Sequence, residues 1–275
     1  MIVFRSIHRL ALTLLFCSIL ATSPASANDY EAATGIGGLE LKKSERIAIM
    51  LEDLYVSETL IKIRYEFKNE SANDISTIVA FPIPPVDVDE ASNSGLFKFS
   101  TLVNGHALTT KVEKKTVAGK DQDDQDVEKT QFTYFWRQTF PARTVITIEH
   151  SYKPITGRSI GFRSGQPLYI DQYQKTYCIE DNLIRSLIKT IGGHSKQKAV
   201  WHDVLITYIL TTGANWSGPI REFRLVVDKG SPKNLVSFCG ENVKQISQTQ
   251  FEMRKNNFLP QKNLNVLILL RDNEE

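Results

Sequence analysis

The chain has 275 residues, 41% of them hydrophobic, and 33 Lys and Arg residues stand against 31 Asp and Glu residues. This composition excludes a disordered chain and is sufficient for one large or two small domains with hydrophobic cores. The near balance of charge excludes the basic excess with which proteins bind a nucleic-acid backbone or an anionic membrane surface, so nucleic acid is not expected as a partner.

The first 27 residues have the layout of a secretory signal peptide. Arg5 and Arg9 precede an apolar run at residues 10–21, and Ala25-Ser26-Ala27 forms a small-x-small cleavage site. The apolar run is too short to cross a bilayer, which takes about 20 residues, and no later segment is long enough either. The sequence predicts cleavage after Ala27, a soluble mature chain without a membrane span, and a periplasmic or secreted location.

Alternating apolar and polar residues predict strands through the first half of the chain. The clearest strand is expected at residues 61–68, and a second at 75–81, where the following prolines end it. Asn104-Gly105 favours a hairpin between residues 97–103 and 108–112, because both residues tolerate positive φ.

Two further features complete the first half. Residues 132–140 and 145–152 are expected to pair as antiparallel strands across Pro141-Ala142. The Asp-rich run at residues 119–126 is expected to be a polar hairpin tip.

The second half has the same strand-rich character and a single helical segment. Strands are expected at residues 204–211, 223–228, 235–238, 251–254 and 264–270. An i, i+3, i+4 apolar pattern that ends at Gly192-Gly193 predicts a helix over about 181–191. The fold class is therefore all-β, with two antiparallel β-sandwich-like halves. A boundary near Ile155 divides an N-terminal domain, 28–155, from a C-terminal domain, 156–275.

The cysteines outside the predicted leader favour one disulfide, because the export signal directs the chain to an oxidising compartment. Once the leader and its Cys17 are removed, only Cys178 and Cys239 remain. Paired thiols in such a compartment are usually joined, so a Cys178–Cys239 disulfide is expected. Two reduced, buried cysteines are the alternative.

One motif of a catalytic family is present, but its context is wrong. Residues 157–161 match the GxSxG pattern of serine hydrolases, with Ser159 as the nucleophile. That motif needs a sharp turn from a strand directly into a helix, and the Gly- and Pro-containing residues that follow cannot form one. A glycine-rich loop is the favoured interpretation, and no catalytic residue is assigned.

No metal or cofactor is expected. The histidines lack the spacing of a zinc site. The run Asp121–Asp126 does not match a calcium-binding EF-hand loop, because Asp126 stands where glycine is required, and a solvated loop is favoured over weak calcium binding. His150 shares a strand face with Ile146, Ile148 and Tyr152, which favours a core histidine.

Aromatic residues provide the candidates for binding a partner. Phe132, Tyr134 and Trp136 occupy one face of a strand, and Phe99 is expected on a neighbouring strand. Asn215 and Trp216 are expected in a turn between two strands. Such residues stack on sugars or anchor protein partners when they are exposed, but they also fill sheet cores. Both interpretations stay open.

Several short motifs together resemble a bacterial exported family known as domain of unknown function 4424. They are Phe81-Pro82-Ile83-Pro84, Thr139-Phe140-Pro141-Ala142, Tyr177-Cys178, Thr212-Gly213-Ala214-Asn215-Trp216 and Asn257-Phe258-Leu259-Pro260. The resemblance covers nearly the whole mature chain and implies no activity. The first half is also similar in layout to the vault and inter-alpha-trypsin type domain, which points to an interaction module.

These observations favour a non-catalytic binding or scaffolding module outside the cytoplasm, whose partner is a protein or a glycan. A secreted hydrolase using Ser159 and a carbohydrate-binding module are the alternatives.

Overall fold

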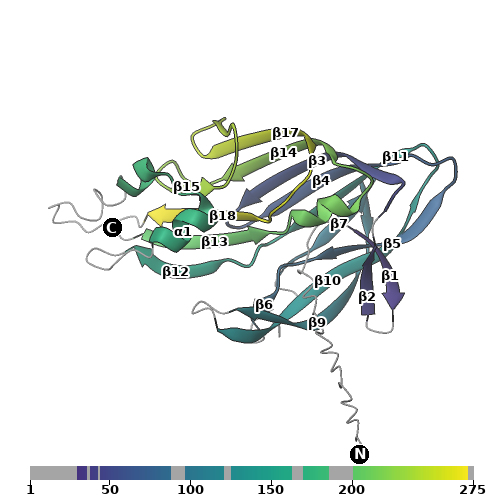
Figure 1. The fold of residues 1–275 in the computed structure, drawn as a ribbon, viewed down its shortest axis with the longest axis horizontal. Coiled ribbons are helices and arrows are strands. Elements are labelled where there is room, and N and C mark those ends of the chain that lie inside the picture. The colour runs from purple at the N-terminus through teal and green to yellow at the C-terminus, as the bar shows by residue number, and fades with distance from the viewer. Residues whose placement is uncertain are drawn as a thin grey trace, which may run out of the picture.

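The computed structural model describes residues 30–35, 38–42, 44–87, 97–120, 125–162, 170–185 and 201–271. Strands dominate these residues and form three sheets, called A, B and C below (Figure 1). The all-β class with a short helix is thereby confirmed. The predicted leader, residues 1–27, lies outside the described residues.

Sheet A is built from six strands of the first half. Its order is β2 (Gly38–Lys42), β1 (Tyr30–Gly35), β5 (Ile75–Pro82), β10 (Asp126–Phe140) and β6 (Val86–Asp87), and β9 (Lys111–Lys120) also pairs with β10. Residues 133–135 of β10 pair with both β5 and β9, so these two strands flank β10 on opposite sides. Strand β9 is therefore an edge of sheet A.

Sheet B is the central sheet and has eight strands. Its order is β16 (Lys244–Gln245), β17 (Gln250–Phe258), β14 (Ile220–Asp228), β3 (Ile47–Ser57), β4 (Ile61–Asn69), β11 (Val145–Tyr152), β7 (Ser100–Val103) and β8 (His106–Leu108). Strands β3 and β14 pair in parallel, with Leu54 opposite Leu225. Strands from before and after residue 155 thus share one sheet, and the division into two domains at that residue stays a prediction.

Sheet C is formed only by the second half. Its order is β12 (Gly157–Phe162), β13 (Trp201–Tyr208), β18 (Leu264–Arg271) and β15 (Leu235–Phe238). Sheets A and C pack against sheet B, and one continuous hydrophobic core joins all three (Figure 1). Residues of β4 contribute to this core beside Phe81 and Phe132 from sheet A and Val204 and Val266 from sheet C. The burial of this apolar face drives the assembly of the layers.

Most predicted strands are present. The turn at Asn104-Gly105 is confirmed, but residues 108–112 do not form one strand, because β8 ends at Leu108 and Lys111 begins β9 in sheet A. Asn104 and Gly105 have φ angles of 49° and 78°, and they connect β7 to β8. The predicted pairing of residues 132–140 with 145–152 is wrong, because β10 belongs to sheet A and β11 to sheet B. The turn after Phe140 carries the chain from sheet A to sheet B. The two strands therefore pack with their apolar faces against the shared core, and their edges do not pair with each other.

The helical part of the chain differs in extent from the prediction. Residues 181–185 are helical, as expected, and residues 186–191 lie outside the described residues. Helix α1 (Ile170–Tyr177) was not predicted. It packs with residues 181–185 on the face of sheet C that points away from sheet B, through Tyr177, Ile179 and Leu183.

The outer face of sheet B carries an ion-pair network centred on Arg224. Arg224 Nη1 lies 3.0 Å from Asp53 Oδ1, and its Nε lies 2.7 Å from Glu252 Oε1. Arg254 Nη2 reaches the same Glu252 oxygen at 2.9 Å. The network connects β14 to β3 and to β17, which joins the C-terminal strands to the N-terminal part of the sheet. Hydrogen bonds from Arg254 and then Arg224 lower the pKa of Glu252 from 4.5 to about 2.

We expect this network to make the protein sensitive to acid. A carboxylate whose pKa is lower in the folded state stabilises folding above its ordinary pKa, and that contribution is lost as the pH falls toward 2. Urea unfolding between about pH 6 and pH 3 should therefore show a decreasing free energy of unfolding, with a shallower slope for Arg224→Gln/Arg254→Gln. Lys233→Gln, at an exposed site, is the control. An unchanged slope in the double variant would contradict the assignment.

Candidate functional site

Three rings from sheets A and B form a stack that runs from a half-buried residue into the core, and we call it the ring stack. Its members are Tyr134 on β10, Phe99 just before β7, and His150 on β11. The Phe99 ring lies 4.1 Å from Tyr134 at an interplanar angle of 14°, and 5.2 Å from His150 at 25°. Tyr134 and Phe99 are half-buried, whereas His150 is buried. Burial raises the pKa of Tyr134.

Further aromatic residues surround the buried end of the ring stack. Ring centroids of Phe81 and Trp136 lie 4.9 and 5.4 Å from His150. The imidazole Nδ1 is 3.0 Å from Thr101 Oγ1, so the ring is both packed and hydrogen-bonded. His150 is thus a core histidine, as its strand face indicates.

Tyr152 lies next to the ring stack and carries a buried hydroxyl group. Its ring centroid is 5.8 Å from Phe81 and 6.1 Å from Phe99. The residue is 2% exposed, and its Oη has no hydrogen-bond partner within the described part of the chain. A buried hydroxyl without a partner costs about 1–3 kcal/mol, so this group is an exception that calls for a role. Burial raises the pKa of Tyr152 far above its ordinary value, so it stays protonated and able to donate.

A set of three polar side chains connects the core of sheet B with sheet C. The hydroxyls of Tyr65 and Tyr208 are 3.0 Å apart, and Tyr208 Oη donates to Glu52 Oε1 at 3.4 Å. Each tyrosine hydroxyl carries one proton, so the three groups form a short hydrogen-bonded chain between β3, β4 and β13. Burial, with Tyr65 and Glu52 nearby, raises the pKa of Tyr208.

The position of Glu52 inside the core follows from a register shift in β3. Ile47 and Ile49 point into the core, and the pairing with β4 shifts between Ile49 and Leu51. After the shift, Glu52, Leu54 and Val56 point inward instead. A bulge reverses the faces of the residues that follow it, and this places a carboxylate among tyrosines.

Most of the aromatic candidates from the sequence are buried in the core. Phe132, Trp136 and Trp216 are at most 5% exposed, so they fill the core and do not form an exposed platform. Tyr134 and Asn215 are half-buried, and their role as partner contacts stays a prediction. Tyr134 belongs to the ring stack, and Trp136 lies beside His150 in that stack. Trp216 packs against Phe67 instead, with 4.7 Å between the two ring centroids.

Ser159 lies within a strand and not at a nucleophile turn. Strand β12 contains the whole GxSxG segment, so the predicted glycine-rich loop is wrong. Ser159 pairs with Asp203 of β13 in an antiparallel ladder. Asp203 is buried, and it contributes with burial to raising the pKa of Tyr177 to about 12. An extended strand lacks the strained turn and the adjoining helix N-terminus that activate a serine in hydrolases of this motif.

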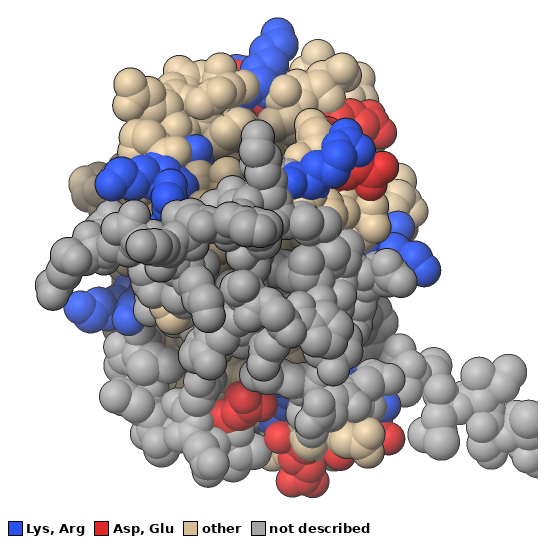
Figure 2. Space-filling model, turned by 90° about the vertical axis from the view of Figure 1, so that its left-hand side faces the viewer, with Lys and Arg blue, Asp and Glu red and all other residues tan. Residues whose placement is uncertain are grey.

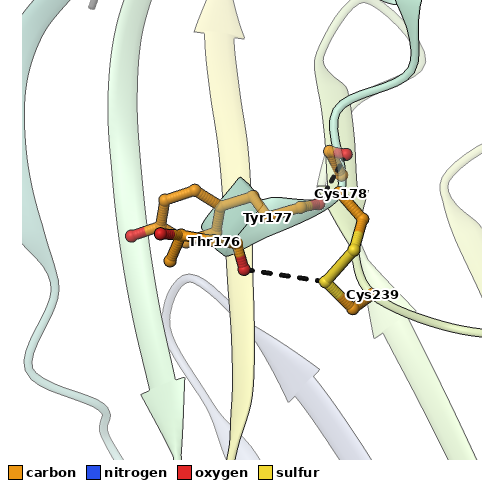
Figure 3. Close-up of a disulfide and its surroundings, with 5 residues drawn as sticks. Thr176, Tyr177, Cys178 and Cys239 are labelled. Carbon is orange, nitrogen blue, oxygen red and sulfur yellow. Dashed lines mark hydrogen bonds between the residues drawn. A yellow bond between two sulfur atoms is a disulfide. The ribbon is translucent and has the colours of Figure 1, made fainter. Parts of the chain in front are cut away.

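The predicted disulfide is present. Cys178 and Cys239 are joined with an S–S distance of 2.09 Å, and the bond ties the end of α1 to the segment after β15 (Figure 3). Cys239 Sγ also lies 3.7 Å from the carbonyl oxygen of Thr176. Nearby, Ser237 Oγ donates to the carbonyl oxygen of Tyr177 at 2.9 Å, so a hydrogen bond and the disulfide hold the same end of α1.

The described residues contain neither a metal-binding cluster nor a membrane-spanning helix. No cluster of three or more His, Cys, Asp or Glu side chains in this part of the chain could hold a metal ion. Residues 121–124 of the Asp-rich run lie outside it. Among the described helices, none is long and apolar enough to cross a bilayer. Charged side chains of both signs are interspersed over the coloured residues at the end of the molecule shown in Figure 2.

A family model decides the relationship of the chain. The model for the domain of unknown function DUF4424 matches residues 27–131 and 117–267. The chain belongs to this family. The two matched regions together span both sides of the predicted boundary at residue 155, so the DUF4424 unit includes sheets A, B and C. No curated protein matches the chain in sequence.

Solved structures show a related fold at low sequence identity. A crystal structure from Legionella pneumophila, described as a candidate nutrient binding protein, is 14% identical with a TM-score of 0.50 and covers 88% of this chain and 70% of that chain. An M1 zinc metallopeptidase from Deinococcus radiodurans is 9% identical with a TM-score of 0.31, and this chain spans only 43% of its length. The DUF4424 fold is therefore shared with the Legionella protein.

Proposed function

We propose that this protein is a non-catalytic binding protein that acts outside the cytoplasm and holds a small organic nutrient beside the ring stack. The ligand would present a planar or apolar face to the rings and a hydrogen-bonding group to Tyr152. The shared fold with a protein described as a nutrient binding protein supports the class of function. The strand geometry at Ser159 supports the absence of hydrolase chemistry.

The proposed location has two supports. The leader at residues 1–27 has the layout of an export signal. The Cys178–Cys239 disulfide suits an oxidising compartment, because cytoplasmic thiols are kept reduced.

The observation that carries the proposal is the hydroxyl group of Tyr152. It is a protonated donor in the core, beside aromatic rings, and the described residues offer it no acceptor. Binding sites for small molecules combine such a mainly apolar and aromatic lining with a few polar groups that orient the ligand. The half-buried Tyr134 and Phe99 place the outer end of the stack nearer to solvent.

Calorimetric titration of the full mature chain with a panel of monosaccharides, amino acids and nucleosides tests the proposal. A ligand from the panel should bind, and Tyr152→Phe should weaken it about tenfold, which corresponds to the loss of one hydrogen bond. The stability of Tyr152→Phe should be equal to or greater than that of the wild type, because a buried polar group without a partner is removed.

Tyr65→Phe is the matched control for that experiment. It removes a hydroxyl that bonds to Tyr208, so it should lower stability, while ligand affinity changes less than in Tyr152→Phe. If Tyr152→Phe destabilises the fold and leaves the affinity of the bound ligand unchanged, the hydroxyl has a structural role only and the site is elsewhere.

We expect no serine-hydrolase activity. A fluorophosphonate probe should label the wild type and Ser159→Ala equally weakly, because Ser159 lies in a paired strand. Strong labelling that disappears in Ser159→Ala, read by mass spectrometry, would replace the binding proposal with a hydrolase.

A further inference from the structure

Strand β9 forms a long and regular edge of sheet A among the described strands. It pairs with β10 through ten consecutive residue pairs, from Lys111 opposite Phe135 to Lys120 opposite Asp126, without a register shift. Among the described strands β10 is its single partner, and β9 lies at the lower rim of the molecule in Figure 1. The N–H and C=O groups of β9 that do not pair with β10 therefore point along the sheet to a side where no described strand pairs with them.

Natural proteins usually protect such an edge in several ways. Short edge strands, prolines, bulges and charged side chains all prevent another strand from pairing. Strand β9 is ten residues long and contains neither a proline nor a bulge. Its protection rests on lysine side chains, which repel a basic strand and attract an acidic one.

Three of the lysines on β9 are available to a partner. Lys111, Lys114 and Lys115 are exposed and form no ion pair within the described part of the chain. Lys114 Nζ lies 5.1 Å from the centroid of the Phe132 ring. Lys120, in contrast, is already paired with Asp126 at 2.8 Å. The basic character is thus concentrated at the beginning of β9.

The strand geometry sets the spacing of the complementary charges. Successive side chains alternate between the two faces of a sheet, so Lys111 and Lys115 share one face and Lys114 lies on the other. Residues directly opposite each other on paired strands have Cβ atoms about 4.5–5.5 Å apart. Val112, 44% exposed, adds an apolar contact on the face of Lys114.

We infer that the edge of β9 binds an extended acidic segment of another protein, which adds to sheet A as an antiparallel strand. The segment carries acidic residues at two adjacent positions, opposite Lys115 and Lys114, and a third opposite Lys111. Main-chain hydrogen bonds supply affinity in this mode of recognition, and the side chains supply specificity. The inference uses no residue of the ring stack, so it stands or falls separately from the proposed nutrient site.

A synthetic peptide tests the inference on the full mature chain. The peptide is about ten residues long, with Glu at the three positions that face Lys111, Lys114 and Lys115 and Thr or Val elsewhere. Two further versions carry N-methyl groups on one or the other set of alternate backbone nitrogens. Only one set faces β9, so one methylated peptide should bind like the parent and the other at least about tenfold more weakly.

Charge reversal provides the second arm of the test. Lys111→Glu/Lys114→Glu/Lys115→Glu should lose the acidic peptide and bind a version with Lys in place of Glu. The control Lys153→Glu/Lys233→Glu/Lys262→Glu changes net charge equally at exposed sites outside β9 and should bind as the wild type does. Raising the salt from about 50 to about 300 mM should weaken binding, because ion pairs at an exposed edge are screened.

Two outcomes would overturn the inference. Equal binding of both methylated peptides would show electrostatic adsorption without strand pairing. Failure of the parent peptide to bind, together with self-association of Lys111→Thr/Lys114→Thr/Lys115→Thr in analytical ultracentrifugation, would show that the lysines serve only to prevent pairing of β9 with a second copy.

Discussion

Trp216→Ala is expected to lower the free energy of unfolding by about 3–5 kcal/mol, the range for large aromatic residues removed from a core. Trp216 is 1% exposed and follows the 3₁₀ helix η2 (Thr211–Asn215). Its ring centroid lies 4.7 Å from Phe67 and 6.2 Å from Phe140, and so contacts both sheet B and sheet A. The adjoining Ser217 N–H donates to the carbonyl oxygen of Ile47 at 2.9 Å, which fixes the segment against β3.

Urea unfolding followed by circular dichroism measures the effect without relying on tryptophan fluorescence. Trp216→Phe keeps part of the ring volume and should lose about half as much stability as Trp216→Ala. Leu259→Ala, at a residue 49% exposed, is the control and should change stability by less than about 0.5 kcal/mol. If Trp216→Ala is as stable as the wild type, Trp216 does not stabilise the core, and it is again a candidate for contact with a partner.

Strands were predictable where the pattern that defines them is local. Ile61, Ile63, Tyr65 and Phe67 alternate with polar residues along β4, and the structure buries all four on one face. Strand β3 was missed because its register shift interrupts the alternation and places Glu52 inside. Period-two patterns detect a strand only while its faces stay in phase.

The partners of the strands were much less predictable than the strands themselves. Residues 132–140 and 145–152 are both strands, but β10 and β11 belong to different sheets. The parallel pair of β3 and β14 joins segments on either side of the predicted boundary at residue 155. The partner of a strand depends on which apolar faces are buried together in the complete fold. A local sequence motif does not identify that partner.

The candidate site was also only partly predictable, because several of its residues are distant in sequence. The aromatic pattern of Phe132, Tyr134 and Trp136 identified one wall of it, and the strand face of His150 indicated a core position. Tyr152, Glu52 and Tyr208 were not recognised as site residues, because they come from β11, β3 and β13 and meet only in the folded core. The disulfide, in contrast, was predictable from the count of cysteines outside the predicted leader.

Removal of the disulfide should lower the free energy of unfolding by about 2–4 kcal/mol in Cys178→Ser/Cys239→Ser. The bond closes a loop with a sequence separation of 61 residues, so the unfolded chain gains considerable freedom without it. Protein purified from its host should show no free thiol at either cysteine on alkylation, and reduction of the wild type should reproduce the stability of the double variant.

The place where hydrogen-exchange protection is lost shows whether the disulfide stabilises α1 on sheet C or the whole fold. Helix α1 contacts sheet C through a small cluster that includes Tyr177, Ile179 and Leu267, whereas β4 lies in the large core shared by the three sheets. Hydrogen exchange in native buffer should therefore lose protection in α1 and residues 181–185 before β4 changes, because locally held segments open first. Ser237→Ala removes only the hydrogen bond to Tyr177 and should produce a smaller effect at the same place. Equal loss of protection in α1 and β4 would mean that the disulfide stabilises the fold as a whole and not the packing of α1 on sheet C.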